Sequence, residues 1–172
     1  MEDVTEELQQ TRWRPMCSGD LPEVVRIAAC VHPDYPEEEH VFAERLALFP
    51  EGCRLLVDGE EALGYIISHP WSRRAPPALD TRLGTLSERA DTYYIHDLAL
   101  MPRTRGKGLA VEAVISAVTT AKSRGLAILS LVAVGKSAEF WQAQGFAVVQ
   151  DEDVQRSLAS YGGAAHYMER VI

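Results

Sequence analysis

The chain is predicted to form one mixed α/β domain, because three kinds of element follow one another along its 172 residues. The N-terminal half holds short apolar runs that meet at a tight turn, which is typical of antiparallel strands. The middle holds a strand, a glycine-rich turn and an apolar helical run, which together predict a strand–helix–strand crossover. Two further strands close the chain. The predicted architecture is a mixed, mostly antiparallel sheet flanked by helices.

The N-terminal half is predicted to contain two helices and three strands. Residues 1–11 are polar and are expected to form a flexible tail, with residues 12–172 as a single domain. Asp20 is expected to be the N-cap of the first helix, and Pro22 to lie in its first turn. The prolines of the run 32–36 end that helix. The expected elements are a strand at 11–17, a first helix up to residue 31, a helix at 37–49, and strands at 53–57 and 62–68 around a turn.

The C-terminal half is predicted to contain the crossover and the closing strands. Residues 70–90 are rich in proline, arginine and glycine, and a loop of that length is usually functional or mobile. Gly125 is expected to end the central helix and Gly145 the helix after it, whereas residues 151–163 are polar. The expected elements are a strand at 92–100, a helix at 106–124, a strand at 127–134, a helix at 136–144, and strands at 146–150 and 166–171.

The composition argues against several classes of function. A net charge of −8 opposes nucleic acid as the main partner. No run approaches the ~18 apolar residues that span a membrane. The acidic N-terminus lacks the features of a secretion signal, so a cytoplasmic protein is expected. Three cysteines without a Cys-x-x-Cys pair suggest no disulfide framework, and five histidines without ligand spacing suggest no metal site. Both a monomer and a homodimer fit the sequence.

A glycine-rich basic turn at residues 103–110 is the strongest candidate for a binding site. It follows a predicted strand and opens the central helix, whose first N–H groups and dipole favour an anion. Gly106 and Gly108 allow the backbone to approach a phosphate closely. The positive side chains of the turn are Arg103, Arg105 and Lys107.

Two common nucleotide loops do not fit this turn. A Walker A loop needs glycine at the position of Met101 and a hydroxyl residue at that of Gly108. A dinucleotide fingerprint needs glycine or alanine where Val111 stands. The turn also lies in the middle of the chain rather than after a first strand. We therefore expect a phosphorylated ligand of another kind.

The pattern Arg-x-x-Gly-x-Gly at residues 103–108 resembles the acetyl-CoA pyrophosphate loop of the GCN5-related N-acetyltransferase (GNAT) family. Residues 98–102 resemble the family's strand before that loop, and residues 138–146 resemble its C-terminal Phe-Tyr-x-x-x-Gly-Phe block. The resemblance covers about residues 12–172. It implies the GNAT fold, whose two central strands splay apart around the cofactor, and transfer of an acetyl group from acetyl-CoA to an amine.

The resemblance also implies which residues hold acetyl-CoA. Strand residues would pair with the pantetheine amides, backbone N–H groups would surround the pyrophosphate, arginines would meet the 3′-phosphate, and aromatic rings would pack on the pantetheine arm. In that order the residues are Leu98, Ala99 and Leu100; Arg105, Gly106, Lys107, Gly108, Leu109 and Ala110; Arg103 and Arg105; and Phe140 and Trp141.

His96 is the first candidate for the base that takes a proton from the amine, because imidazole titrates at about pH 6.5. On a regular strand it shares a face with Tyr94. Asp97 is a further candidate, but it points to the other face, which favours a bracing role. Serotonin-type (arylalkylamine) N-acetyltransferases, which residues 64–71 also resemble, carry two histidines on this strand. The second matches His96 but the first matches Tyr94, so no paired-histidine relay is implied.

The departing thiolate benefits from a proton, and the family's usual donor is missing here. Trp141 stands where the family's block has tyrosine, and an indole N–H cannot release its proton at accessible pH. Three alternatives are open. A hydroxyl of Tyr94 or Tyr161 donates the proton, the thiolate leaves unaided, or the protein binds acetyl-CoA as a sensor with little turnover.

The acceptor is expected to be the primary amine of a small molecule with an apolar or aromatic body, as the resemblance to serotonin-type enzymes implies. The walls of its site are expected at His32, Asp34 and Tyr35, at the second helix, and along residues 71–90 from Trp71. The glutamates at 37–39 hint at polyamines, but glutamates at a helix start are more often surface residues that offset the helix dipole. A protein or peptide amine is an alternative acceptor.

Overall fold

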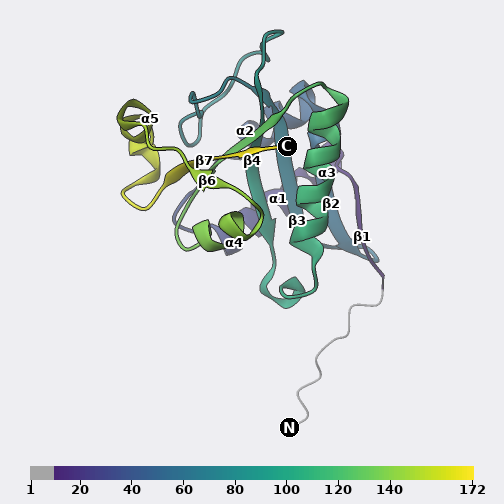
Figure 1. The fold of residues 1–172 in the computed structure, drawn as a ribbon. Coiled ribbons are helices and arrows are strands. Elements are labelled where there is room, and N and C mark those ends of the chain that lie inside the picture. The colour runs from purple at the N-terminus through teal and green to yellow at the C-terminus, as the bar shows by residue number, and fades with distance from the viewer. Residues whose placement is uncertain (1–9) are drawn as a thin grey trace.

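The computed structural model describes residues 10–172, so most of the tail predicted at 1–11 lies outside the described residues. In the described part, seven strands form one sheet in the order β1-β2-β3-β4-β5-β7-β6 (Figure 1). Neighbours are antiparallel except β4 and β5, which are parallel, so the mostly antiparallel sheet and the crossover are confirmed. The strands are β1 (Thr11–Pro15), β2 (Cys53–Asp58), β3 (Glu61–Trp71), β4 (Thr92–Leu100), β5 (Ile128–Ala133), β6 (Ala147–Val148) and β7 (His166–Val171).

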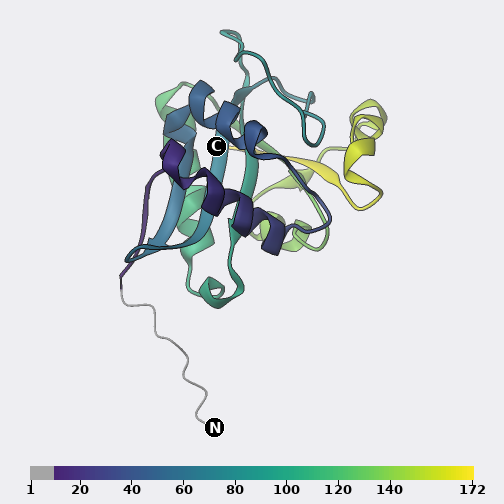
Figure 2. The same cartoon turned by 180° about the vertical axis from the view of Figure 1, so that it is seen from behind.

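Helices cover both faces of the sheet. α1 and α2 pack on one face, and α3 and α4 on the other, each over its own hydrophobic cluster (Figures 1 and 2). Among the described residues, no helix has the length and apolar character needed to cross a membrane. The helices are α1 (Leu21–Val31), α2 (Glu39–Leu48), α3 (Leu109–Ser123), α4 (Ala138–Ala143) and α5 (Glu152–Ser157).

Asp20 precedes α1 as predicted, but its carboxylate does not cap the helix. It instead accepts two hydrogen bonds of 2.8 Å from the Arg14 guanidinium and one of 2.9 Å from the Cys17 N–H. The hydrogen bonds from Arg14 lower the pKa of the Asp20 carboxyl to about 2, against the opposing effect of burial. The pair therefore ties β1 to the start of α1.

We expect Asp20→Asn to lower the free energy of unfolding at pH 7 by about 2 kcal/mol, since one unit of pKa shift corresponds to about 1.4 kcal/mol. A lowered pKa stabilises the fold above the ordinary value of 3.8, and this contribution is lost as the pH falls through about 2. The variant and the parent should therefore converge towards pH 2. Urea unfolding between pH 2 and 7 measures the difference, and a difference that stays constant over that range would contradict this assignment.

β4 and β5 pair only where residues 93–95 meet residues 129–131. Beyond that stretch the two strands diverge, as the GNAT resemblance implies. The N–H of Met101 donates to the Leu63 carbonyl of β3 at 2.8 Å, and alternate residues of an antiparallel strand turn their peptide groups to opposite sides. The peptide groups of Leu98 and Leu100 therefore point into the gap between β4 and β5.

β4 carries a β-bulge at His96. Asp97 pairs with Ile67, but Ile95 pairs with the next residue of β3, Ser68, so that His96 is an extra residue in β4. An extra residue shifts the alternation of the side chains that follow it. His96 and Asp97 consequently both contact residues from the α1–α2 side. The prediction that Asp97 points away from His96 is therefore wrong.

The polar residues 151–163 contain α5 and a short turn, Ala159–Tyr161, neither of which was predicted. Asp151 caps α5, because its Oδ1 accepts the N–H of Asp153 at 3.0 Å and that of Val154 at 3.2 Å. The segment buries Val154 and Leu158. An acidic N-cap before these two apolar residues was the available signal, but six helical residues are too few for a clear period.

Candidate active site

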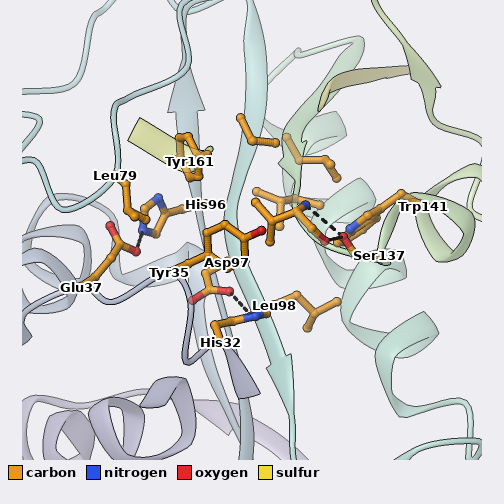
Figure 3. Close-up of a pocket in the computed structure, with 14 residues that line it drawn as sticks. His32, Tyr35, Glu37, Leu79, His96, Asp97, Leu98, Ser137, Trp141 and Tyr161 are labelled. Carbon is orange, nitrogen blue, oxygen red and sulfur yellow. Dashed lines mark hydrogen bonds and ion pairs between the residues drawn. The ribbon is translucent and has the colours of Figure 1, made fainter. Parts of the chain in front are cut away.

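Two adjoining cavities occupy the gap between β4 and β5. The larger, which we call the outer groove, has a volume of about 850 Å³, within the range of roughly 300–1,000 Å³ found for ligand sites. The smaller, which we call the inner chamber, has a volume of about 70 Å³ (Figure 3). The residues that line both cavities, which we call the shared section, are His32, Tyr35, Leu98, Val134, Ser137 and Trp141.

The outer groove is built on the turn between β4 and α3. Gly106 and Gly108 both have a φ of +76°, a left-handed conformation that strains residues with a Cβ. α3 begins at Leu109 with no side chain capping its first amides, which leaves them available to an anion. The predicted cofactor residues that line the groove are Leu98, Leu100, Arg105, Gly106, Gly108, Leu109, Ala110, Phe140 and Trp141.

Three predicted cofactor residues do not line the groove. Ala99 packs in the cluster under α1 and α2, whereas Leu98 packs towards α3. Arg103 forms an ion pair with Glu61 of β3. Lys107 is exposed. The groove is thus formed by the turn, by alternate leucines of β4, by residues 31–35 at the end of α1, and by residues 134–144 around α4.

His96 forms a buried pair with Glu37 at one side of the inner chamber (Figure 3). Its Nε2 lies 2.8 Å from Oε1 of Glu37, and the two side chains are only 1% and 6% exposed. Nδ1 of His96 is buried and makes no hydrogen bond within residues 10–172. Glu37 is therefore not the surface residue that its place near a helix start suggested, and sequence reasoning missed it as a partner of His96.

A second pair, His32 and Asp97, lies at the opening of the chamber. Nε2 of His32 is 3.0 Å from Oδ1 of Asp97, and the hydroxyl of Tyr65 donates to Oδ2. Burial alone would lower the pKa of His32 and raise that of Asp97. Their mutual attraction outweighs burial, so the pKa of His32 lies above its usual value and that of Asp97 below. No three His, Cys, Asp or Glu side chains of the described chain are grouped to hold a metal ion.

The loop between β3 and β4 covers the inner chamber. Leu79 of this loop lines the chamber, and the N–H of Asp80 donates to Oε2 of Glu37 at 3.0 Å. Further hydrogen bonds that hold the loop include those from the Tyr161 hydroxyl to the Pro77 carbonyl (3.0 Å), from the Leu79 N–H to Oγ of Ser160 (3.0 Å), and from buried Arg45 to the Thr81 carbonyl (2.9 Å). The loop thereby encloses the chamber on the side of α2.

Tyr94 and Trp71, both predicted at the site, line neither cavity. Their rings pack on His69, with ring centroids 5.6 Å and 5.5 Å from its own. Burial lowers the pKa of His69 to about 3, so this ring is neutral. The remaining predicted acceptor residues, His32 and Tyr35, belong to the shared section.

Trp141 is buried and forms part of the shared section. It packs edge-on against Phe140 and Phe146, at centroid distances of 5.0 and 5.3 Å. The hydroxyl of Ser137 beside it donates to the Val134 carbonyl at 2.7 Å. The indole of Trp141 and the hydroxyl of Ser137, which is already hydrogen-bonded, therefore lie across the gap from β4 (Figure 3).

Comparison with known proteins gives a family and several similar folds. A model described as "Acetyltransferase (GNAT) family" matches residues 13–146. No curated protein matches the chain at a significant level. The GphF GNAT-like decarboxylase in complex with isobutyryl-CoA has a TM-score of 0.76 at 14% identity, covering 93% of this chain and 98% of that one.

Two further solved structures are similar over their whole length. A chain of the NatC complex bound to Gag peptide and CoA has a TM-score of 0.72 at 16% identity, covering 95% of this chain and 99% of that one. The PaiA N-acetyltransferase from Thermoplasma acidophilum, in complex with coenzyme A, has a TM-score of 0.64 at 14% identity, covering 95% and 100%.

At such identities the solved structures support the fold and not a substrate. The family match is stronger evidence, because it establishes membership of a family. It runs from β1 through the glycine-rich turn to the end of the Phe140–Phe146 block and spans well over half of the chain. This protein belongs to the GNAT acetyltransferase family.

Proposed function

We propose that this protein is an N-acetyltransferase that moves the acetyl group of acetyl-CoA directly to the primary amine of a small molecule. The observation that carries the proposal is the meeting of two cavities with different chemistry. The outer groove offers unpaired helix amides and a glycine turn, which suit a pyrophosphate. The inner chamber holds a histidine–carboxylate pair, which suits removal of a proton from an amine.

The residues of the groove would hold acetyl-CoA, which supplies the activated acetyl group. The amides of the turn and of the start of α3 would bind the pyrophosphate, and the peptide groups of Leu98 and Leu100 would pair with the pantetheine arm. The thioester would then lie in the shared section. The two CoA-bound GNAT-fold structures described above, those with NatC and PaiA, support this assignment.

His96 would take the proton from the attacking amine. Glu37 accepts the hydrogen of Nε2, which leaves Nδ1 as the basic nitrogen. The Glu37 carboxylate would also stabilise the imidazolium that forms. Because the amine attacks the thioester itself, no residue needs to carry the acetyl group.

The covered chamber favours a small acceptor over a peptide. A volume of about 70 Å³ suits a short amine, and the loop with Leu79 closes the side of α2. The test is release of CoA with a panel of alkylamines, arylalkylamines, diamines and short peptides, with the products identified by mass. We expect turnover with small amines. Turnover with peptides alone would indicate a peptide acetyltransferase, and tight CoA binding without any turnover would indicate a sensor.

Gly108→Ala is expected to raise the Kd for CoA about tenfold, or about 1.4 kcal/mol. A Cβ at a φ of +76° meets no atom within 4 Å, so the penalty is conformational, and a left-handed residue costs roughly 1–2 kcal/mol. The turn relaxes away from the conformation that presents its amides. Isothermal titration measures the affinity.

Gly59→Ala is the matched control, because Gly59 has a φ of +61° with equally open space and lies in the β2–β3 turn, away from the groove. This variant should lose a similar amount of stability and no affinity for CoA.

Glu37→Gln is expected to lower kcat about tenfold, a fraction of the roughly 10²–10⁴-fold that a whole acid–base group supplies. The amide keeps the size of the side chain but removes the charge beside His96. Glu38→Gln is the control, because that side chain is 73% exposed and pairs with surface-accessible His40. Steady-state kinetics with the best amine of the panel measure both. Equal rates for the two variants would contradict a role for Glu37.

A further inference from the structure

The proton donor for the departing thiolate is unassigned in the reaction proposed above. Trp141 cannot serve, because its indole N–H does not ionise at accessible pH. Tyr94 lines neither cavity. The hydroxyls of Ser137 and Tyr161 already donate to the carbonyls of Val134 and Pro77. Of the shared section, His32 and Tyr35 remain as groups with an ionisable proton.

His32 is favoured over Tyr35, because its ring pairs with a carboxylate, Asp97, and an imidazolium is a stronger acid than a phenol. It is the C-cap residue of α1, and its backbone N–H donates to the Ala28 carbonyl, which fixes its position at the end of the helix. The ring lines both the outer groove and the inner chamber. Its side chain is 22% exposed, so it is sheltered but reachable.

Asp97 orients the His32 ring. Its Oδ1 lies 3.0 Å from Nε2 of His32, and the hydroxyl of Tyr65 holds its other oxygen. The bulge at His96 creates this contact, because it turns Asp97 to the α1–α2 side. Nε2 of His32 makes no hydrogen bond within the described residues, so Asp97 acts on the ring through its charge at ion-pair distance, and either ring nitrogen of an imidazolium can serve a group in the cavities.

We propose that His32 is the acid that protonates the thiolate of CoA as it leaves, with Asp97 as its positioning residue. This assignment rests on the proposed acetyl transfer. It gives the two histidine–carboxylate pairs of the site opposite tasks: His96 with Glu37 accepts a proton, and His32 with Asp97 donates one.

The electrostatics agree with this division. Burial lowers the pKa of His32, but the Asp97 carboxylate more than compensates and raises it above its usual value. The pKa of Asp97 is lowered in turn, so the carboxylate stays ionised. Both shifts favour an imidazolium at His32 near neutral pH, which is the form an acid must have.

The protons balance over one turnover. The amine nitrogen bonds to the acetyl carbon and gives one proton to His96. The carbon–sulfur bond breaks, and its electron pair goes to sulfur, which takes one proton from His32. The products are an acetamide and the free thiol of CoA. His96 then loses its proton to solvent and His32 regains one, so both residues return to their starting states.

The experiment compares His32→Gln and His96→Gln with two donors, acetyl-CoA and its selenium analogue. A selenolate is a weaker base than a thiolate and leaves without a proton. We expect H32Q to lower kcat with acetyl-CoA by about 100-fold or more, and to regain most of the loss, relative to the parent, with the selenoester. H96Q should lose activity equally with both donors, because the amine must still lose its proton.

CoA affinity and thermal unfolding of each variant separate an effect on catalysis from an effect on folding. If H32Q does not fold, Asp97→Asn takes its place, with a smaller loss that the selenoester also relieves. An equal loss with both donors, or no loss in H32Q, overturns the assignment of His32 while acetyl transfer stands. A parent protein that turns over no amine with either donor overturns the proposed function, and the assignment with it.

Discussion

Replacing His96 with glutamine is expected to lower kcat by about 10²–10⁴-fold, the range that a general base supplies. The side chain is almost fully buried in the inner chamber and has one nitrogen on Glu37 and the other without a hydrogen bond in the described structure. Glutamine has a similar reach and can still meet Glu37, but it cannot accept the proton of an amine. The Kd for CoA should stay unchanged, because His96 does not line the outer groove.

His40→Gln is the control for this variant. His40 is 40% exposed, pairs with Glu38 and lines neither cavity, so its replacement should leave kcat as it is. Steady-state kinetics with a small amine, together with titration of CoA, distinguish the two. If H96Q kept the kcat of the parent, another group would have to be the base, and Glu37 would be the first to test.

Gly52→Ala is expected to reduce the free energy of unfolding by about 4 kcal/mol or more, which is the range of severe core damage. A Cβ at this position would lie 1.8 Å from the carbonyl oxygen of Ser68, a backbone atom of β3 that cannot turn away. The hydroxyl of Ser68 also donates to the Gly52 carbonyl at 2.9 Å. Only glycine allows the start of β2 to approach β3 this closely.

Gly163→Ala is the matched control, since its Cβ would meet no atom within 4 Å and its φ is not left-handed. It should change the free energy of unfolding by less than about 0.5 kcal/mol. Chemical denaturation of both variants gives the comparison. A small loss in G52A would mean that β2 and β3 can separate at this point without cost.

The sequence predicted the elements whose signals are local. β4, the crossover helix and the glycine turn were recognised because strand pattern, left-handed glycines and helix start lie within about thirty residues. The conformation of Gly106 and Gly108 follows from that local pattern. The short α5 was not predicted, because it contains too few residues to show a helical period of apolar side chains.

The side chains of the inner chamber depend on contacts distant in sequence. A strand pattern assigns residues to alternate faces, so it cannot reveal the bulge at His96, which is defined by pairing with β3. The same bulge moves Asp97 to His32 and leaves Leu98 on the α3 side. Glu37 was predicted to be a surface residue for a similar reason. Its burial depends on the loop that carries Asp80, more than forty residues away.

A crystal structure of the protein with CoA would show whether the two cavities form one site for acetyl transfer. We expect the pyrophosphate on the amides of residues 105–110, the pantetheine arm beside Leu98 and Leu100, and the sulfur in the shared section, facing the chamber of His96. A pyrophosphate bound elsewhere, or a sulfur that lies outside the shared section, would contradict this arrangement.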